Sequence, residues 1–147
     1  MTPWRDVNAW HELRNATAWT SGLLPPDLAD VHDAAPVDVL TASARTHGWS
    51  SAVVDLRDAR DKAGAMDAFA AGLSLPAYFG RNWDALWDCL TDDTLLPEPA
   101  RRVIVVDRWR TFADRNTDDW DRIRELLRDA AEYWAGTRTP MVVLVRW

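Results

Sequence analysis

Cysteine is almost absent from this 147-residue chain, which contains only Cys89. A single cysteine cannot form an internal disulfide, so the sequence fits a reducing compartment and excludes a cysteine-rich metal cluster. Long apolar runs are absent too: the longest, from Met141 to Val145, is far shorter than the roughly 20 residues that cross a bilayer. The N-terminus lacks a basic segment leading into an apolar one. We therefore expect no secretory signal, no membrane association and a cytoplasmic location.

Lysine is equally scarce, because Lys62 is the only one among 17 basic residues, which face 23 acidic ones. The net charge of −6 disfavours nucleic acid as a partner, since phosphates repel an acidic chain that lacks a strong basic patch. No basic cluster is longer than Arg101-Arg102. A basic protein is the more natural partner.

Common catalytic signatures are missing. The six glycines form neither GxGxxG nor GxxxxGK[ST], and the His11-Glu12 pair lacks the second histidine of a zinc-protease helix. The histidines are scattered and none is close to Cys89 in the sequence, so we interpret this thiol as structural and half-buried. We expect no enzymatic activity, no metal site and no cofactor.

The hydrophobic pattern changes near residue 36. Before it, residues 3–14 are typical of a helix, 16–20 of a strand and 24–36 of a loop. After it, the spacing of apolar residues predicts a helix that follows Pro36 and stops at Gly48, then strands and helices in the order strand 51–56, helix from 61, helix 82–91, strand 103–106, helix 118–134 and strand 141–147. Three strands joined by helical crossovers predict an α/β fold with a small parallel sheet covered by helices.

The helix predicted over 82–91 concentrates negative charge. Five acidic residues and a single base, Arg81, lie between residues 81 and 98. At 100° per residue, the apolar side chains of this helix form one stripe, and Asp84 and Asp88 project side by side from the opposite face. Three interpretations remain open: a solvated acidic face, a carboxylate pair for acid/base chemistry or Mg²⁺ binding, and a recognition surface for a cationic pocket.

The stretch from Leu75 to Thr91, LPAYFGRNWDALWDCLT, resembles the binding loop and helix of the barstar family, which are intracellular inhibitors of barnase-type ribonucleases. A second stretch, Val106 to Phe112 (VDRWRTF), is similar to the strand and the acidic-x-Trp-Arg-x-Phe segment of that family. The resemblance covers about residues 50–147. It implies a barstar-like, three-stranded parallel sheet in a domain over 49–147, and residues 1–48 are expected to be an extension on the same domain that can add a strand and a helix.

The resemblance also implies which residues contact the partner. Asp88 would be the chief anchor, in the place of a substrate phosphate, and Asp84 would pair with neighbouring cations. The full set of partner-binding residues implied in this way is Tyr78, Gly80, Asn82, Asp84, Trp87, Asp88, Thr91 and Asp129. After the helix, Asp92-Asp93 replace a glycine and an aromatic residue of the family pattern.

The function implied by the resemblance is that of a ribonuclease inhibitor. The acidic helix and preceding loop would mimic RNA phosphates and block the active site of a small secreted guanyl-type ribonuclease in a 1:1 complex. Two alternatives stay open. One is an immunity or binding module of the same fold directed at a different toxin or a cellular protein. The other is a carboxylate-dependent phosphodiesterase, which would turn over substrate and require Mg²⁺.

Overall fold

The structure is a computed structural model that describes residues 29–31, 37–46, 48–134 and 137–146. Its centre is a four-stranded, all-parallel sheet with the strand order β1-β4-β3-β2. The strands are β1 (Ala29–Val31), β2 (Ser50–Asp55), β3 (Arg102–Asp107) and β4 (Met141–Arg146). Parallel neighbours need crossover connections, and helices supply them here.

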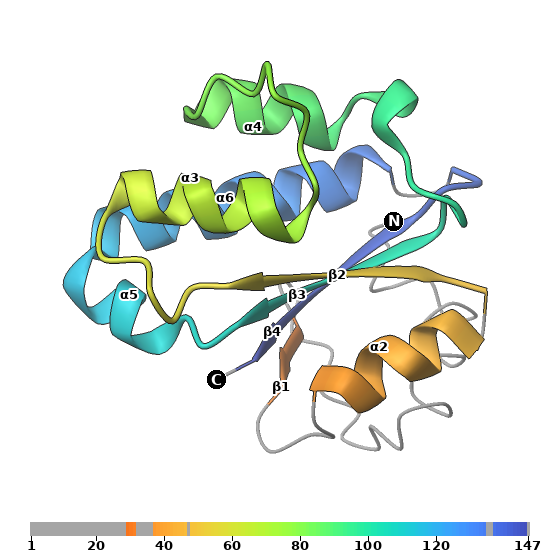
Figure 1. The fold of residues 1–147 in the computed structure, drawn as a ribbon, viewed down its shortest axis with the longest axis horizontal. Coiled ribbons are helices and arrows are strands. Elements are labelled where there is room, and N and C mark those ends of the chain that lie inside the picture. Colours follow the sequence, from red (N-terminus) through yellow and green to blue (C-terminus); the bar gives the residue numbers. More distant parts are fainter. Residues whose placement is uncertain (1–28, 32–36, 47, 135–136, 147) are drawn as a thin grey trace.

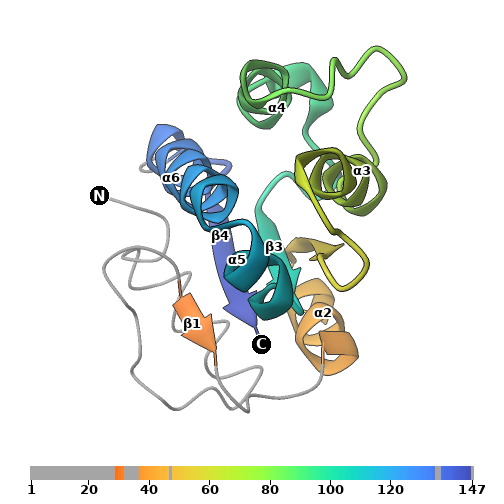
Figure 2. The same cartoon turned by 90° about the vertical axis from the view of Figure 1, so that its left-hand side faces the viewer.

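The helices cover both faces of this sheet (Figure 1). They are α2 (Val37–Thr46), α3 (Lys62–Gly72), α4 (Trp83–Leu90), α5 (Arg110–Arg115) and α6 (Thr117–Tyr133), with a short 3₁₀ turn η2 (Asp93–Leu95) after α4. Helix α2 lies on one face, α3 and α6 lie on the other, and α5 lies at the carboxyl end of the strands (Figures 1 and 2). Helix α4 lies outside α3 and α6, farther from the sheet than either (Figures 1 and 2).

Strand β3 is buried along its whole length, which explains its run of β-branched residues. Side chains that alternate along the strands, such as Val54, Ile104 and Val143, belong to the core shared with the helices. The last residue of α3, Gly72, approaches β2 so closely that a Cβ there would lie 2.3 Å from the carbonyl oxygen of Val53. Glycine is therefore required where this helix crosses the strand.

The structure confirms the predicted α/β class, the three parallel strands after residue 49 and the helix after Pro36. The prediction of a loop over 24–36 is wrong for residues 29–31, which form β1 and pair with Leu144–Arg146 of β4. Too few residues form β1 for alternation to mark it. The N-terminal part thus adds both a strand and a helix. The predicted helix 3–14 and strand 16–20 lie outside the described residues, and the domain division at residue 48 stays a prediction.

Two short elements were not predicted. Helix α5 follows β3 directly, and its six residues are too few to show helical periodicity. The turn η2 contains Asp93, and Asp92 caps it by accepting a hydrogen bond from the backbone N–H of Thr94 at 2.9 Å. Within the described residues, no helix is long and apolar enough to cross a membrane.

Candidate functional site

The loop before α4 is anchored at its middle and exposed on either side. Phe79 is buried, whereas Tyr78 keeps 72% of its surface exposed. The positive φ of this turn, 55°, belongs to Arg81 and not to Gly80. The side chain of Arg81 forms an ion pair with Asp67 of α3. The one base in the acidic segment is therefore engaged with a neighbouring helix.

Gly80 and Asn82 shape the start of α4. A Cβ on Gly80 would lie 3.3 Å from the Cβ of Ala85, so a larger residue would crowd the first turn. Asn82 is the N-cap of α4: its Oδ1 accepts a hydrogen bond from the N–H of Ala85 at 2.8 Å. Its Nδ2 donates to the carbonyl of Gly80 at 3.3 Å. Both residues therefore have a local structural role, whatever the partner.

Helix α4 is amphipathic as predicted. Leu86 and Leu90 are buried on its inner face, while Asp84 and Asp88 are exposed on the outer one. Cys89 is more deeply buried than a half-buried thiol, with 7% exposed. Burial raises the pKa of this thiol, and the nearby carboxylates of Asp92 and Asp88 raise it further. These features fit the interpretation of Cys89 as a structural thiol.

A groove of about 190 Å³ lies between α4 and α6. Carboxylates line both sides of it, since Asp84 comes from α4 and Asp129 from α6. The complete lining is Trp83, Asp84, Trp87, Arg122, Glu125, Leu126 and Asp129. The structure thus brings Asp129 next to Asp84 and Trp87, although more than 40 residues separate them in the chain.

The remaining predicted residues extend this surface. Trp87 is half-buried, and its ring meets the edge of the Tyr133 ring at a centroid distance of 6.0 Å. Thr91 follows the helix, and its hydroxyl donates to the carbonyl of Trp87 at 2.8 Å. Asp88 lies on the exposed face of α4 but does not line the groove.

Sequence reasoning missed Arg122, Glu125 and Tyr133. Their signal was present, because residues 122, 125, 129 and 133 follow the three- and four-residue steps of one helix face. That face could not be matched to α4 without knowing how the two helices pack. Arg122 and Glu125 also approach each other, with Nη1 and Oε2 3.9 Å apart.

The arrangement offers carboxylates and indole rings, which are suited to holding a cation. In the part of the chain that the structure describes, no cluster of three or more histidine, cysteine, aspartate or glutamate residues could hold a metal ion. Asp84 and Asp88 are exposed, so they lack the burial that usually prepares a carboxyl group for proton transfer.

The fold and this surface define a small α/β protein that presents acidic side chains to its surroundings. Comparison with protein families shows that residues 49–146 match the family described as "Barstar (barnase inhibitor)". The chain therefore belongs to the barstar family, which consists of inhibitors and related binding modules, not of enzymes. No curated protein matches the chain.

Proposed function

We propose that this protein inhibits a small guanyl-type ribonuclease by covering its active site with α4, the loop before α4 and the facing side of α6. The observation that carries the proposal is the α4/α6 groove, in which Asp84 and Asp129 face a common space beside Trp87. Such a groove can receive a cationic side chain, which would contact carboxylates and an aromatic ring at once.

The electrostatics of α4 supports the same function. A ribonuclease must hold RNA phosphates with cationic side chains, and carboxylates placed at the right spacing can substitute for those phosphates. Asp84 and Asp88 lie one helical turn apart on the exposed face, and Arg81 is paired with Asp67. No described ion pair or hydrogen bond engages either carboxylate, so both are available to a partner.

Each proposed contact residue has a distinct task. Asp88 is the central anchor, and Asp84 and Asp129 hold cations at the groove. Tyr78 provides an exposed aromatic contact, and Trp87 provides a rigid wall. Gly80, Asn82 and Thr91 fix the shape of the loop and the helix end, through the contacts described above, and present backbone and side-chain atoms at the margin.

Inhibition of this kind is competitive with RNA, and its natural setting is a cytoplasmic immunity protein that protects its host from a ribonuclease made for export. The proposed complex contains one copy of each protein. A second candidate is a module of the same fold aimed at a different toxin. The replacement of the family's glycine and aromatic residue by Asp92-Asp93 favours it, because η2 gives the margin of this surface its own shape.

The test measures binding and cleavage at several salt concentrations. The proposal predicts tight binding to a guanyl-type ribonuclease at low ionic strength, weaker binding as salt is added, and no RNA cleavage by the chain itself with or without Mg²⁺. Binding only to another toxin would select the second candidate. Turnover of RNA by the chain with added Mg²⁺ would overturn both.

A further inference from the structure

One backbone carbonyl at the end of α4 has two side-chain donors from distant parts of the chain. The oxygen of Leu90 accepts a hydrogen bond from Nη2 of Arg102, at the start of β3, at 2.9 Å. It accepts a second from Nε1 of Trp134, at the end of α6, also at 2.9 Å. The last carbonyls of a helix have no partner within it, so these donors satisfy a group that would otherwise be buried and unpaired.

The environment of Arg102 is not one in which an arginine would stabilise the fold. Only 8% of it is exposed, and its Nε has no hydrogen-bond partner. Burial lowers its pKa to about 10. Among the described residues, no carboxylate forms an ion pair with it, and its guanidinium lies 5.4 Å from the centre of the Trp134 ring. A buried charge without a counter-charge is costly, and the negative end of the α4 dipole offsets only part of that cost.

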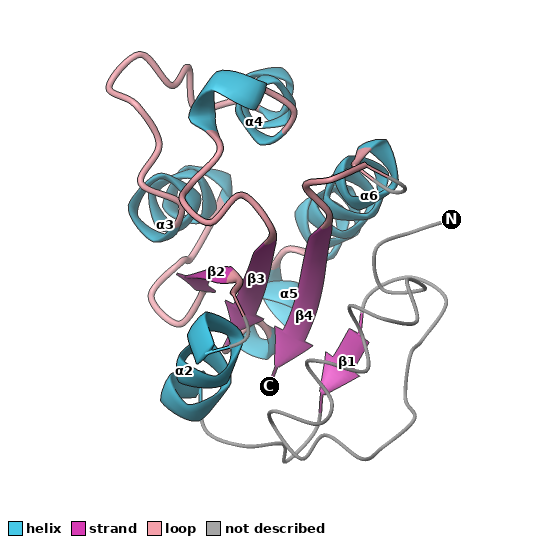
Figure 3. Ribbon diagram, turned by 90° about the vertical axis from the view of Figure 1, so that its right-hand side faces the viewer, coloured by secondary structure: helices cyan, strands magenta, loops and turns pink. Residues whose placement is uncertain are grey.

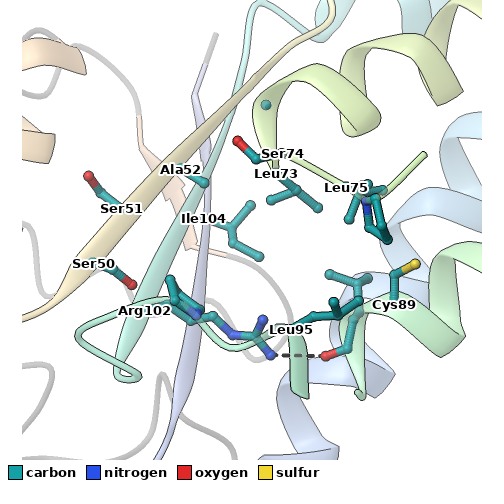
Figure 4. A pocket seen from close by; sticks show the side chains of 14 residues that line it. Ser50, Ser51, Ala52, Leu73, Ser74, Leu75, Cys89, Leu95, Arg102 and Ile104 are labelled. Carbon is teal, nitrogen blue, oxygen red and sulfur yellow. Dashed lines mark hydrogen bonds between the residues drawn. The ribbon is translucent and has the colours of Figure 1, made fainter. Parts of the chain in front are cut away.

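Packing does not fix this end of α4 completely. A cavity of about 220 Å³ lies between the sheet, the segment after α3 and the inner face of α4 (Figure 4). Figure 3 shows the backbone of these elements, with α3 and α4 on the same side of β2 and β3. Leu73, Leu75, Cys89 and Leu95 line it, and the Arg102 side chain crosses its floor to reach the Leu90 carbonyl (Figure 4). Because side-chain packing leaves space there, the two hydrogen bonds to the Leu90 carbonyl determine the position of the helix end.

A chain of ring contacts links the same point to the exposed surface. The Trp134 ring meets Tyr133 at a centroid distance of 5.0 Å, and Tyr133 meets Trp87 of α4 at 6.0 Å. Both contacts are edge-to-face, an arrangement that aromatic pairs prefer. The C-terminal half of α4 is thus held at Leu90 and at Trp87, on either side of Asp88.

We propose that Arg102 and Trp134 are positioning residues, which hold the C-terminal end of α4 so that Asp88 and Asp84 are presented in the geometry that the partner requires. The role in recognition rests on the proposed function, whereas the effect on α4 itself does not. The role of Arg102 would then be to place α4 and not to stabilise the fold.

The first experiment needs no partner. Backbone amide hydrogen exchange is measured by NMR on the full chain for Arg102→Met, Trp134→Phe and the double variant. Arg101→Met is the matched control, because this neighbouring arginine also lies over a tryptophan ring, that of Trp49 at 4.5 Å, and its loss changes the charge equally. We expect the amides of α4 to exchange about tenfold faster in the double variant, while the exchange rates of the α3 amides stay unchanged. The unfolding midpoint of Arg102→Met should stay close to that of the parent.

The second experiment is a double-mutant cycle with a ribonuclease that the parent inhibits. Arg102→Met is expected to raise the dissociation rate about tenfold in the parent and in Tyr78→Ala, but much less in Asp88→Ala, because the anchor it positions is then missing. Equal effects in all three backgrounds would contradict positioning through Asp88.

The two proposals fail in distinguishable ways. If the parent binds no ribonuclease while α4 exchange accelerates in the variants, the proposed function is wrong and the positioning of α4 stands. If α4 exchanges as in Arg101→Met, or if every helix exchanges faster alike, Arg102 and Trp134 do not position this helix and the inference is overturned.

Discussion

Replacing Asp88 with alanine is expected to leave the fold slightly more stable and to weaken the complex strongly. The side chain is exposed, and no described ion pair or hydrogen bond involves it. Alanine removes the repulsion with Asp84 one turn earlier, improves helix propensity and takes a negative charge from the negative end of an eight-residue helix. Together these effects amount to about 1 kcal/mol, which raises the unfolding midpoint by roughly 2–4 °C.

The effect on binding has the opposite sign and is larger. In the complex, the loss of one carboxylate leaves partner cations buried without a counter-charge, which costs about 2–5 kcal/mol. The dissociation constant should therefore rise about 30-fold to several thousandfold, mainly through faster dissociation. Titration calorimetry and stopped-flow dissociation measure the two quantities, and thermal unfolding measures the stability of the same samples.

Asp114→Ala is the matched control for this variant. It changes the net charge equally, and Asp114 is exposed on α5, far from α4 in Figures 1 and 2. The control should bind within about threefold of the parent, since it alters only long-range attraction. Asp88 is not the anchor if Asp88→Ala binds as tightly as Asp114→Ala, or if Asp88→Ala loses stability in proportion to its loss of affinity.

Three further outcomes follow from other contacts. Gly72→Ala should lower the free energy of unfolding by about 1–3 kcal/mol in urea titration, because its Cβ would meet the carbonyl of Val53, and an unchanged midpoint would contradict the close crossing. Burial alone would raise the pKa of Asp55, but hydrogen bonds and the charge of Arg108 lower it below 3.8. The stability from this pair is present above pH 4 and is lost as pH falls through the lowered pKa, so Arg108→Ala should destabilise the protein more at pH 6 than at pH 2, and equal differences at both would refute this. The burial of Cys89 and its raised pKa predict slower alkylation at pH 7.5 than that of a free thiol, and a rate equal to glutathione's would show that the thiol is accessible.

The parts of the fold that the sequence predicted are those with local signals. Helix α4 begins at Asn82, a cap with a short side chain, and its apolar stripe repeats every three or four residues. The central strand was visible as an unbroken run of β-branched residues, typical of a strand buried on both faces. The loop and the acidic face of α4 could likewise be assigned from neighbouring residues alone.

The parts that were missed depend on contacts between distant segments. Strand β1 has three residues and is identifiable only by its pairing with β4. The groove requires α6 to lie beside α4, so the helical spacing of Glu125 and Tyr133 could not assign them to a site until the packing of the two helices was known. The bond from Arg102 to the Leu90 carbonyl joins a strand to a helix end, and a buried arginine in an apolar strand gives no indication of its acceptor.

Titration of the full chain into a guanyl-type ribonuclease, with RNA cleavage followed at each addition, measures whether the protein is a stoichiometric inhibitor. Cleavage is expected to fall linearly, to reach zero at one equivalent and to be restored by a large excess of RNA. Asp88→Ala should shift this curve far more than Asp114→Ala does. Undiminished cleavage and no binding heat across a panel of such enzymes would show that the protein does not inhibit guanyl-type ribonucleases.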